Sequence, residues 1–177
     1  RRGRYSDPGE SMHTKRLEFN RNIIFNNMFQ WFVLVLVAII VGYAFIAFCF
    51  QTVTVIGPSM SPTLEDEQVV VVNKLAYRFH SVERYDVIAY SKVGTNSYYE
   101  IKRVIGLPGE TVQIRDGYVY INGTALMDIP IHEQIANAGI ATREITLGSS
   151  EYFVLGDNRN NSEDSRFSNV GNVKYSS

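Results

Sequence analysis

The hydrophobic pattern of the chain begins with one long apolar stretch. Residues 31–50 read WFVLVLVAIIVGYAFIAFCF, and no charged residue occurs between Arg21 and Glu65. Twenty helical residues span about 30 Å, the thickness of the hydrocarbon core of a bilayer. The alternatives are a buried core helix or a cleaved leader, but a leader's apolar core runs to only about 7–15 residues. We therefore predict a retained transmembrane helix over residues 31–50, within helical residues 21–50.

After residue 50 the pattern changes to short runs rich in Val, Ile and Tyr, which is typical of β-strands. Asp116-Gly117 and Asn122-Gly123 are pairs that favour tight hairpin turns. Lys74–Phe79 fits a short helical turn, and residues 124–150 predict loops with at most one strand. The expected strands are Thr52–Ile56, Gln68–Val72, Asp86–Tyr90, Tyr98–Ile105, Thr111–Ile114, Tyr118–Ile121 and Tyr152–Leu155.

These patterns divide the chain into an N-terminal segment (1–30), a transmembrane helix (31–50) and a β-rich domain (51–177). Residues 1–20 are polar and mixed in charge, so we expect a disordered tail there. The third part has a length that can bury its own core. The predicted fold class is therefore mainly β, preceded by one N-terminal transmembrane helix.

Charge is distributed unevenly along the chain. Residues 1–50 carry six Lys or Arg and three Asp or Glu, whereas residues 51–177 carry eleven and fifteen. The basic residues precede the helix, so the N-terminus is expected in the cytoplasm and residues 51–177 outside. The net charge of −1 gives no reason to expect a nucleic-acid partner.

Few residues of the metal-binding types are present. Cys49, the single cysteine, lies within the predicted span, so the outer domain has no disulfide and no cysteine metal site. His13, His80 and His132 are scattered and are expected at the surface, which leaves a Ser-His-Asp triad poorly supported. We expect no metal and no cofactor.

Three segments carry residues that are suited to chemistry. The first, GPSMSPTL at 57–64, brackets Ser59 and Ser61 with two prolines and a glycine. Proline fixes φ and glycine permits unusual φ, so such a loop holds a hydroxyl in one place. The composition equally describes an ordinary loop, and both interpretations stay open on this pattern alone.

The second segment is YYEIKRVIGLPGE at 98–110. Alternation along a strand puts Lys102 and Arg103 on opposite faces, and each face also carries apolar residues. We therefore expect one of the two cations to turn toward the core, and the pattern does not say which. The alternative is that both cations stay in solvent.

The third segment, GDNRNNSEDSRF at 156–167, concentrates Asp, Asn, Ser and Arg after an apolar strand. Asp and Asn oxygens at alternate positions suit Ca²⁺, but Arg159 and Arg166 would repel a cation and the spacing of an EF-hand is missing. A network of Asp–Arg pairs is the better structural hypothesis, and a solvated loop is the alternative.

Together and in this order, the three segments resemble the boxes of the bacterial type I signal peptidase family. GPSMSPTL resembles the nucleophile box, KRVIGLPGE the lysine box and GDNRNNSEDSR the C-terminal box. The resemblance covers about residues 30–171 and implies a signal-peptidase-like β-sheet catalytic domain of the compact, Gram-positive-like form. In two places the chain departs from the family pattern: Tyr85 stands where the family has glycine, and residues 65–68 lack the usual Gly-Asp. Family members also continue with a further strand, so we expect a bare sheet edge in a chain truncated at Ser177.

The resemblance implies a membrane-bound serine endopeptidase that cleaves signal peptides from exported preproteins by acyl transfer. Ser59 would be the nucleophile and the neutral amine of Lys102 its general base. A lysine has a pKa of about 10.4 in water, so Lys102 should be buried to bring its pKa to about 7.5. The oxyanion would rest on the backbone N–H of Ser59, because Gly57 offers no side-chain donor.

Supporting roles for five further residues follow from the same resemblance. Arg103 is expected to pair with Asp157, and Arg166 with Asp164. Ser162 matches the family serine that hydrogen-bonds and orients the lysine, here Lys102.

The expected partners are signal peptides of secretory preproteins and the lipid of the cell membrane. The substrate is expected to bind as an extended strand, with small side chains in shallow pockets beside Ile56 and Met60. Two alternatives remain: a relative of the self-cleaving SOS repressors, which the membrane span argues against, and a non-catalytic membrane-anchored β module or inactive peptidase homologue. The oligomeric state is not predicted.

Overall fold

The computed structural model describes residues 8–91, 99–127 and 133–175, and for residues 8–24 it describes the backbone alone. The chain divides into two compact units, Arg1–Cys49 and Phe50–Ser177. We describe each unit by itself.

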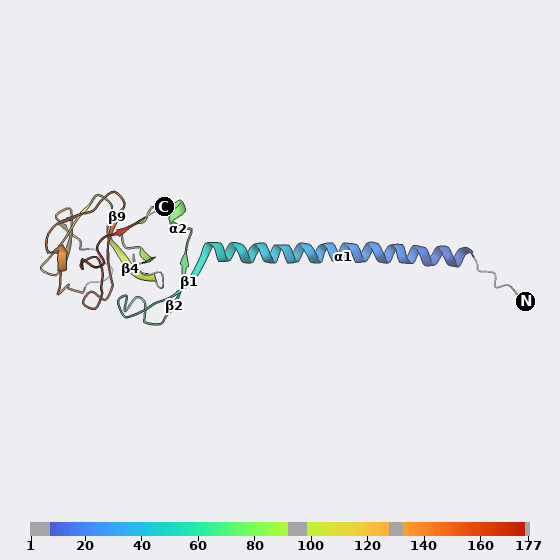
Figure 1. Ribbon diagram of the computed structural model, residues 1–177, viewed down its shortest axis with the longest axis horizontal. Coiled ribbons are helices and arrows are strands. Elements are labelled where there is room, and N and C mark those ends of the chain that lie inside the picture. Colours follow the sequence, from blue (N-terminus) through green and yellow to red (C-terminus); the bar gives the residue numbers. More distant parts are fainter. Residues whose placement is uncertain (1–7, 92–98, 128–132, 176–177) are drawn as a thin grey trace, which may run out of the picture. The chain divides into compact units, whose positions relative to one another are not determined.

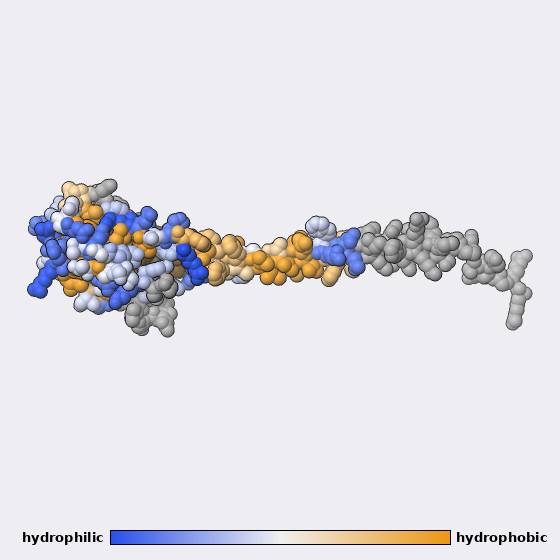
Figure 2. Space-filling view, turned by 90° about the horizontal axis from the view of Figure 1, so that it is seen from above, coloured by the Kyte–Doolittle hydropathy of each residue, from blue (hydrophilic) through white to orange (hydrophobic). Residues whose placement is uncertain are grey.

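The first unit contains one helix, α1 (Pro8–Cys49). Within it, Phe25–Cys49 has a mean hydropathy of 2.9 and is long and apolar enough to cross a membrane. Figure 2 shows this stretch as a largely apolar rod, with exposed Leu, Val, Ile and Phe side chains. The helix ends at Cys49, so Phe50, which we predicted as its last residue, begins the first strand instead.

The prediction of a disordered tail is wrong for residues 8–20, because α1 begins at Pro8. Proline suits the first turn of a helix, where its missing N–H would have no partner. The segment that follows contains Glu, Met, Lys, Arg and Leu, which all favour helix. Residues 1–7 of the predicted tail lie outside the described residues.

The second unit is mainly β, as predicted, and its described strands form three antiparallel sheets (Figure 1). One sheet pairs β1 with β2, the second has the order β10-β9-β4-β3, and the third has the order β7-β6-β5-β8. The strands are β1 (Phe50–Thr54), β2 (Val69–Asn73), β3 (Val87–Ser91), β4 (Tyr99–Gly106), β5 (Thr111–Arg115), β6 (Tyr118–Ile121), β7 (Thr124–Ala125), β8 (Ile145–Thr146), β9 (Glu151–Leu155) and β10 (Val173–Lys174). Two short helices, α2 (Ala76–Phe79) and the 3₁₀ helix η1 (Gly139–Thr142), complete the elements.

All seven predicted strands are present, although Tyr98 of the fourth lies outside the described residues. The predicted helical turn is α2. The strands β7, β8 and β10 were not predicted, and two strands rather than one lie within residues 124–150. Each of these three has two residues, too few to show a period of two.

Both predicted hairpin turns are confirmed. Asp116 and Gly117, with φ of 51° and 80°, connect β5 to β6, and Asn122 and Gly123, with φ of 50° and 77°, connect β6 to β7. Positive φ at both central residues is the geometry that twists the two strands of a hairpin correctly.

Strand β4 is an inner strand of its sheet, because β3 pairs with one of its edges and β9 with the other. All its residues from Ile101 to Gly106 are buried. Lys102 and Arg103 are therefore both buried, at 5% and 8% exposure, which corrects the prediction of a single buried cation. The alternation of side chains did not predict that both cations are buried, because other segments cover both faces of this strand.

Candidate active site

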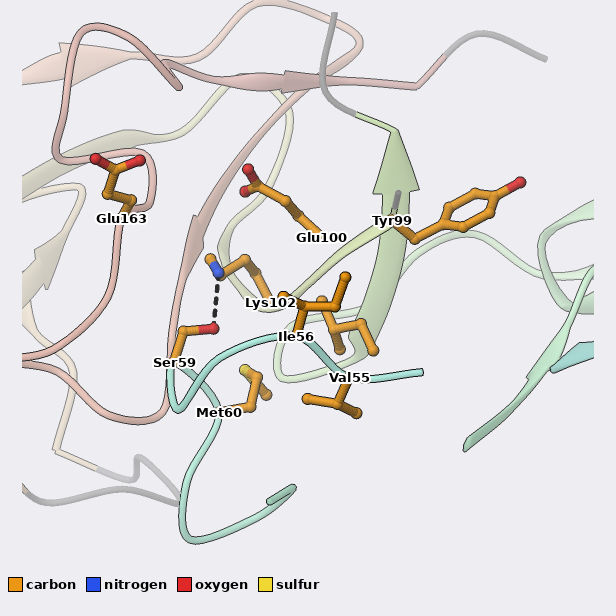
Figure 3. Close-up of a pocket in the computed structure, with 9 residues that line it drawn as sticks. Val55, Ile56, Ser59, Met60, Tyr99, Glu100, Lys102 and Glu163 are labelled. Atoms are coloured by element: carbon orange, nitrogen blue, oxygen red, sulfur yellow. Dashed lines mark hydrogen bonds between the residues drawn. The ribbon is translucent and has the colours of Figure 1, made fainter. Parts of the chain in front are cut away.

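Ser59 and Lys102 come together although 43 residues separate them in the chain. Ser59 lies in the turn after β1, and Lys102 lies in the middle of β4. The Nζ atom of Lys102 is 2.9 Å from Oγ of Ser59, and the dashed line in Figure 3 marks this hydrogen bond. A buried amine beside a hydroxyl is the arrangement that Ser/Lys acyl transfer needs.

The loop that carries Ser59 is held at several points. The backbone N–H of Gly57 donates to Oδ1 of Asp66 at 2.7 Å. The carbonyl of Ser59 accepts from the backbone N–H of Asn158 at 3.0 Å, and the carbonyl of Pro58 accepts from Nδ2 of Asn158 at 3.1 Å. Neither Asp66 nor Asn158 was predicted as a site residue, and for Asn158 the only available signal was its position inside the third segment.

Arg103 and Asp157 form a buried ion pair, in the pairing that we expected. Arg103 donates to both carboxylate oxygens of Asp157, from Nε at 2.7 Å and from Nη2 at 2.5 Å. Thr63 Oγ1 donates to the same carboxylate at 2.5 Å, and Arg103 Nη1 donates to the carbonyl of Tyr85 at 2.8 Å. The pair therefore joins β4, the Ser59 loop and the start of the third segment.

Asp164 and Arg166 form a second buried pair, again in the expected pairing. Arg166 donates from Nε at 2.7 Å and from Nη2 at 2.8 Å to the two oxygens of Asp164. Asp164 also accepts from the backbone N–H of Gly156 at 3.1 Å. Buried charges of this kind are tolerated when they are paired and hydrogen-bonded, and these bonds fix the segment against β9.

The expected hydrogen bond from Ser162 to Lys102 is not formed. Oγ of Ser162 is buried and has no hydrogen-bond partner among the described residues. The hydroxyl lies instead over the α-carbon of Gly156, where a Cβ would come under 3.0 Å from it and from the Ser59 carbonyl oxygen. The missing side chain of Gly156 is what allows the Ser59 and Ser162 segments to approach each other this closely.

A pocket of about 180 Å³ opens beside Ser59 and Lys102. Ile56 and Met60, the two expected substrate-binding residues, both line it, but Ile56 is 66% exposed whereas Met60 is fully buried. Figure 3 shows Glu100 and Glu163 on the side of Lys102 away from Met60. The full lining is Val55, Ile56, Ser59, Met60, Tyr99, Glu100, Ile101, Lys102 and Glu163.

Glu100 is anchored from the neighbouring strand. The hydroxyl of Tyr90 in β3 donates to Oε2 of Glu100 at 3.0 Å. Burial first, and then the nearby Glu100 carboxylate, raises the pKa of Tyr90 above its ordinary value of 10. Tyr90 therefore stays protonated and continues to donate over the whole physiological range.

The described residues, 8–91, 99–127 and 133–175, contain no group of three or more His, Cys, Asp and Glu side chains that could hold a metal ion. Two of the three acidic residues of the third segment, Asp157 and Asp164, bind arginines instead.

Comparison with known proteins places this chain in a family. The model of the signal peptidase family, peptidase S26, matches residues 28–177. The chain belongs to this family. It is therefore a serine endopeptidase, and hence a hydrolase.

Individual signal peptidases are similar over most of the chain. Signal peptidase I of Bacillus licheniformis is 34% identical over 148 residues, which are 80% of this chain and 79% of that protein. Signal peptidase I of Bacillus caldolyticus is 36% identical, over 77% of this chain and 78% of that protein. A crystal structure of a signal peptidase I from Enterococcus faecalis V583 is 38% identical, covers 54% of this chain and 91% of that chain, and has a TM-score of 0.43.

Proposed function

We propose that this signal peptidase is anchored in the membrane by α1 and removes signal peptides from exported preproteins with a Ser59/Lys102 dyad. The observation that carries the proposal is the 2.9 Å hydrogen bond between the buried Nζ of Lys102 and Oγ of Ser59. Burial favours the neutral form of an amine, and only the neutral amine can accept the serine proton. The relatives that support the substrate class are named signal peptidase I.

The reaction has two halves. Ser59 Oγ attacks the carbonyl carbon at the cleavage site while its proton passes to Nζ of Lys102. The C–N bond of the tetrahedral intermediate then breaks, Lys102 gives the proton to the leaving amine, and the signal peptide remains as an ester on Ser59. Water, deprotonated by Lys102, hydrolyses the ester and restores the serine hydroxyl.

The buried ion pairs would support this chemistry without taking part in it. Arg103–Asp157 joins β4 to the third segment, and Arg166–Asp164 fixes the conformation of the third segment itself. An arginine cannot act as the base because it does not lose its proton in proteins. In this proposal Ser162 packs against Gly156 and does not orient Lys102 in the substrate-free state.

The substrate would lie as an extended strand across the pocket beside Ser59. Val55, Ile56, Met60 and Ile101 give part of the pocket an apolar lining, and its volume suits small side chains next to the cleaved bond. Adding a strand to an exposed sheet edge is a common mode of peptide recognition.

The proposed anchor places the reaction near the membrane. The Lys and Arg residues of the first fifty positions all precede the apolar span, which favours a cytoplasmic N-terminus and an outer catalytic unit. Nine residues separate Phe50 from Ser59, and a chain of that length reaches about 30 Å at most. Preproteins emerging from the membrane would meet Ser59 close to its outer surface.

Cleavage of a preprotein by the full chain in detergent tests the dyad. We expect Ser59→Ala and Lys102→Ala to lower kcat by at least about 10³-fold with unfolding temperatures close to the parent's. The rate should rise with pH as Lys102 loses its proton, with a midpoint well below the ordinary lysine pKa of about 10.4. The control is Asn160→Ala, which lies in the same unit but away from the dyad. Substantial cleavage by Lys102→Ala would refute this mechanism. A parent protein that does not cleave would favour an inactive homologue.

A further inference from the structure

Hydrogen bonds to the Pro58 carbonyl orient the peptide group between Pro58 and Ser59. The carbonyl of Pro58 accepts a hydrogen bond from Nδ2 of Asn158 at 3.1 Å, across 100 residues of sequence. The next carbonyl, that of Ser59, accepts from the backbone N–H of Asn158 at 3.0 Å. One residue of the third segment therefore holds two consecutive carbonyls of the nucleophile loop.

The carbonyl of Pro58 also accepts from the backbone N–H of Ser61 at 3.1 Å, so the Asn158 side chain and the turn itself together determine where the N–H of Ser59 points. In a planar trans peptide the C=O and N–H bonds point in opposite directions. Because the Pro58 carbonyl faces Asn158, the N–H of Ser59 faces away from Asn158. This N–H has no hydrogen-bond partner within residues 8–91, 99–127 and 133–175, so it is available to a substrate.

The neighbouring N–H group of the loop is already occupied. Gly57 donates its N–H to Oδ1 of Asp66, which also accepts from the N–H of Glu67 at 3.0 Å. Pro58 has no N–H, so within residues 57–59 no backbone donor other than the Ser59 N–H remains for a substrate. An oxyanion donor is effective only when it is aimed before the reaction begins.

We propose that Asn158 is a positioning residue, whose side-chain amide turns the Pro58–Ser59 peptide so that the Ser59 N–H meets the developing oxyanion. This inference rests on the proposed function. Asn158 touches neither the substrate nor the reacting atoms, and acts through the Pro58 carbonyl. Loss of the amide donor leaves the Pro58 carbonyl with the Ser61 N–H as its remaining donor. The peptide is then held less firmly, which should weaken binding of the transition state more than binding of the substrate.

The main test variant is Asn158→Asp, because it has nearly the same shape and replaces the amide donor by an acceptor that repels the Pro58 carbonyl. Asn158→Ala removes the donor without adding charge, and both variants keep the backbone N–H that binds Ser59. Both are made in the full chain and assayed in detergent at a temperature where circular dichroism shows them folded. We expect kcat to fall about tenfold or more, with KM within about threefold of the parent.

A peptide aldehyde with a small residue at its aldehyde end separates orientation from general damage. The O–H of Ser59 adds across the aldehyde C=O to give a hemiacetal, whose oxygen takes the oxyanion position. Its inhibition constant should weaken by about the same factor as kcat/KM in each Asn158 variant. Asn160→Ala is the matched control, because the Asn160 amide binds Glu133 and Gln134 rather than the nucleophile loop.

Either of two results for the Asn158 variants would overturn the inference: a kcat within threefold of the parent, or a loss confined to KM with unchanged aldehyde inhibition. A similar loss of kcat in Asn160→Ala would also contradict the inference, because it would show that any damage to this segment lowers the rate and that the Asn158 amide has no special role. Failure of the proposed function looks different, since the parent would then not cleave, or Ser59→Ala would still cleave.

Discussion

At the scale of single residues, two buried arginines of the third segment, Arg159 and Arg166, differ in whether their guanidinium groups have hydrogen-bond partners. Arg166 donates to both oxygens of Asp164 and to the carbonyl of Asn137. Arg159 is 1% exposed, yet its Nε and Nη2 atoms have no partner among the described residues. Burial lowers the pKa of Arg159, and the nearby Asp157 opposes that shift only in part. The two side chains should therefore contribute very differently to stability.

Replacing each arginine by methionine tests this difference. Arg166→Met leaves Asp164 charged and unpaired, so the free energy of unfolding should fall by about 3–5 kcal/mol. Arg159→Met removes an unpaired buried charge and leaves both Asp–Arg pairs in place, so the free energy of unfolding should fall by less than about 1 kcal/mol. Thermal unfolding of both variants in one detergent measures the contrast, and equal losses would contradict it.

At the scale of elements, turns and connections are tied to the sheets by ion pairs. Arg84, just before β3, donates to both oxygens of Glu110, which lies between β4 and β5, and also to the carbonyl of Ile105. Burial alone would raise the pKa of Glu110, but hydrogen bonds from Arg84 and from the Leu107 N–H lower it below its ordinary value of 4.5. This carboxylate therefore stabilises the fold only while it is ionised.

The lowered pKa predicts how stability depends on pH. A carboxyl group with a lowered folded pKa adds stability above its unfolded pKa, and this stability is lost as the pH falls through the folded pKa. Glu110→Gln should thus lower the free energy of unfolding by about 1 kcal/mol at pH 7 and by progressively less below pH 4.5. Unfolding temperatures of parent and variant between pH 3 and 7 measure this. Exposed Glu144→Gln is the control, and a constant difference across the range would argue against the pair.

At the scale of the whole molecule, the apolar helix and the mainly β unit expose different kinds of surface. The side chains of Phe25–Cys49 are almost all exposed, and an exposed apolar surface of this size is more favourable in lipid than in water. The described residues of the second unit form three buried clusters, of which the largest lies around Ile105, Val112 and Phe153. Membrane attachment should accordingly depend on α1.

Charged substitutions in the middle of α1 test the anchor. Leu36→Arg with Ile40→Arg places two cations near the centre of the span, each costing about 2.5–3.5 kcal/mol on insertion. The variant should lose most of its resistance to extraction from membranes by alkaline carbonate. Leu36→Ala with Ile40→Ala should stay in the membrane fraction. Equal retention of both variants would contradict anchoring by this helix. The orientation is tested separately, by adding protease to the outer side of the membrane. Protection of residues 51–177 from this protease would contradict the proposed orientation.

Some of the site was not predictable from local pattern. Tyr85 and Glu67 lie where the chain departs from the family pattern, and both have the positive φ, 76° and 63°, that favours glycine. The sequence showed the departures but gave no φ values. Ser162 was expected to bind Lys102, and its actual place over Gly156 depends on how closely two distant segments approach.

What the sequence determined by itself is local. The apolar span, the seven longer strands and both Gly-containing turns follow from periodicity and from the φ values that each residue type allows, which act within a few residues. Tertiary structure alone decided that β4 is covered on both faces, so that Lys102 and Arg103 are both buried, and that Asn158 reaches the Pro58 carbonyl across 100 residues. These contacts depend on which segments pack together, and side chains far apart in sequence carry no periodic signal of their meeting.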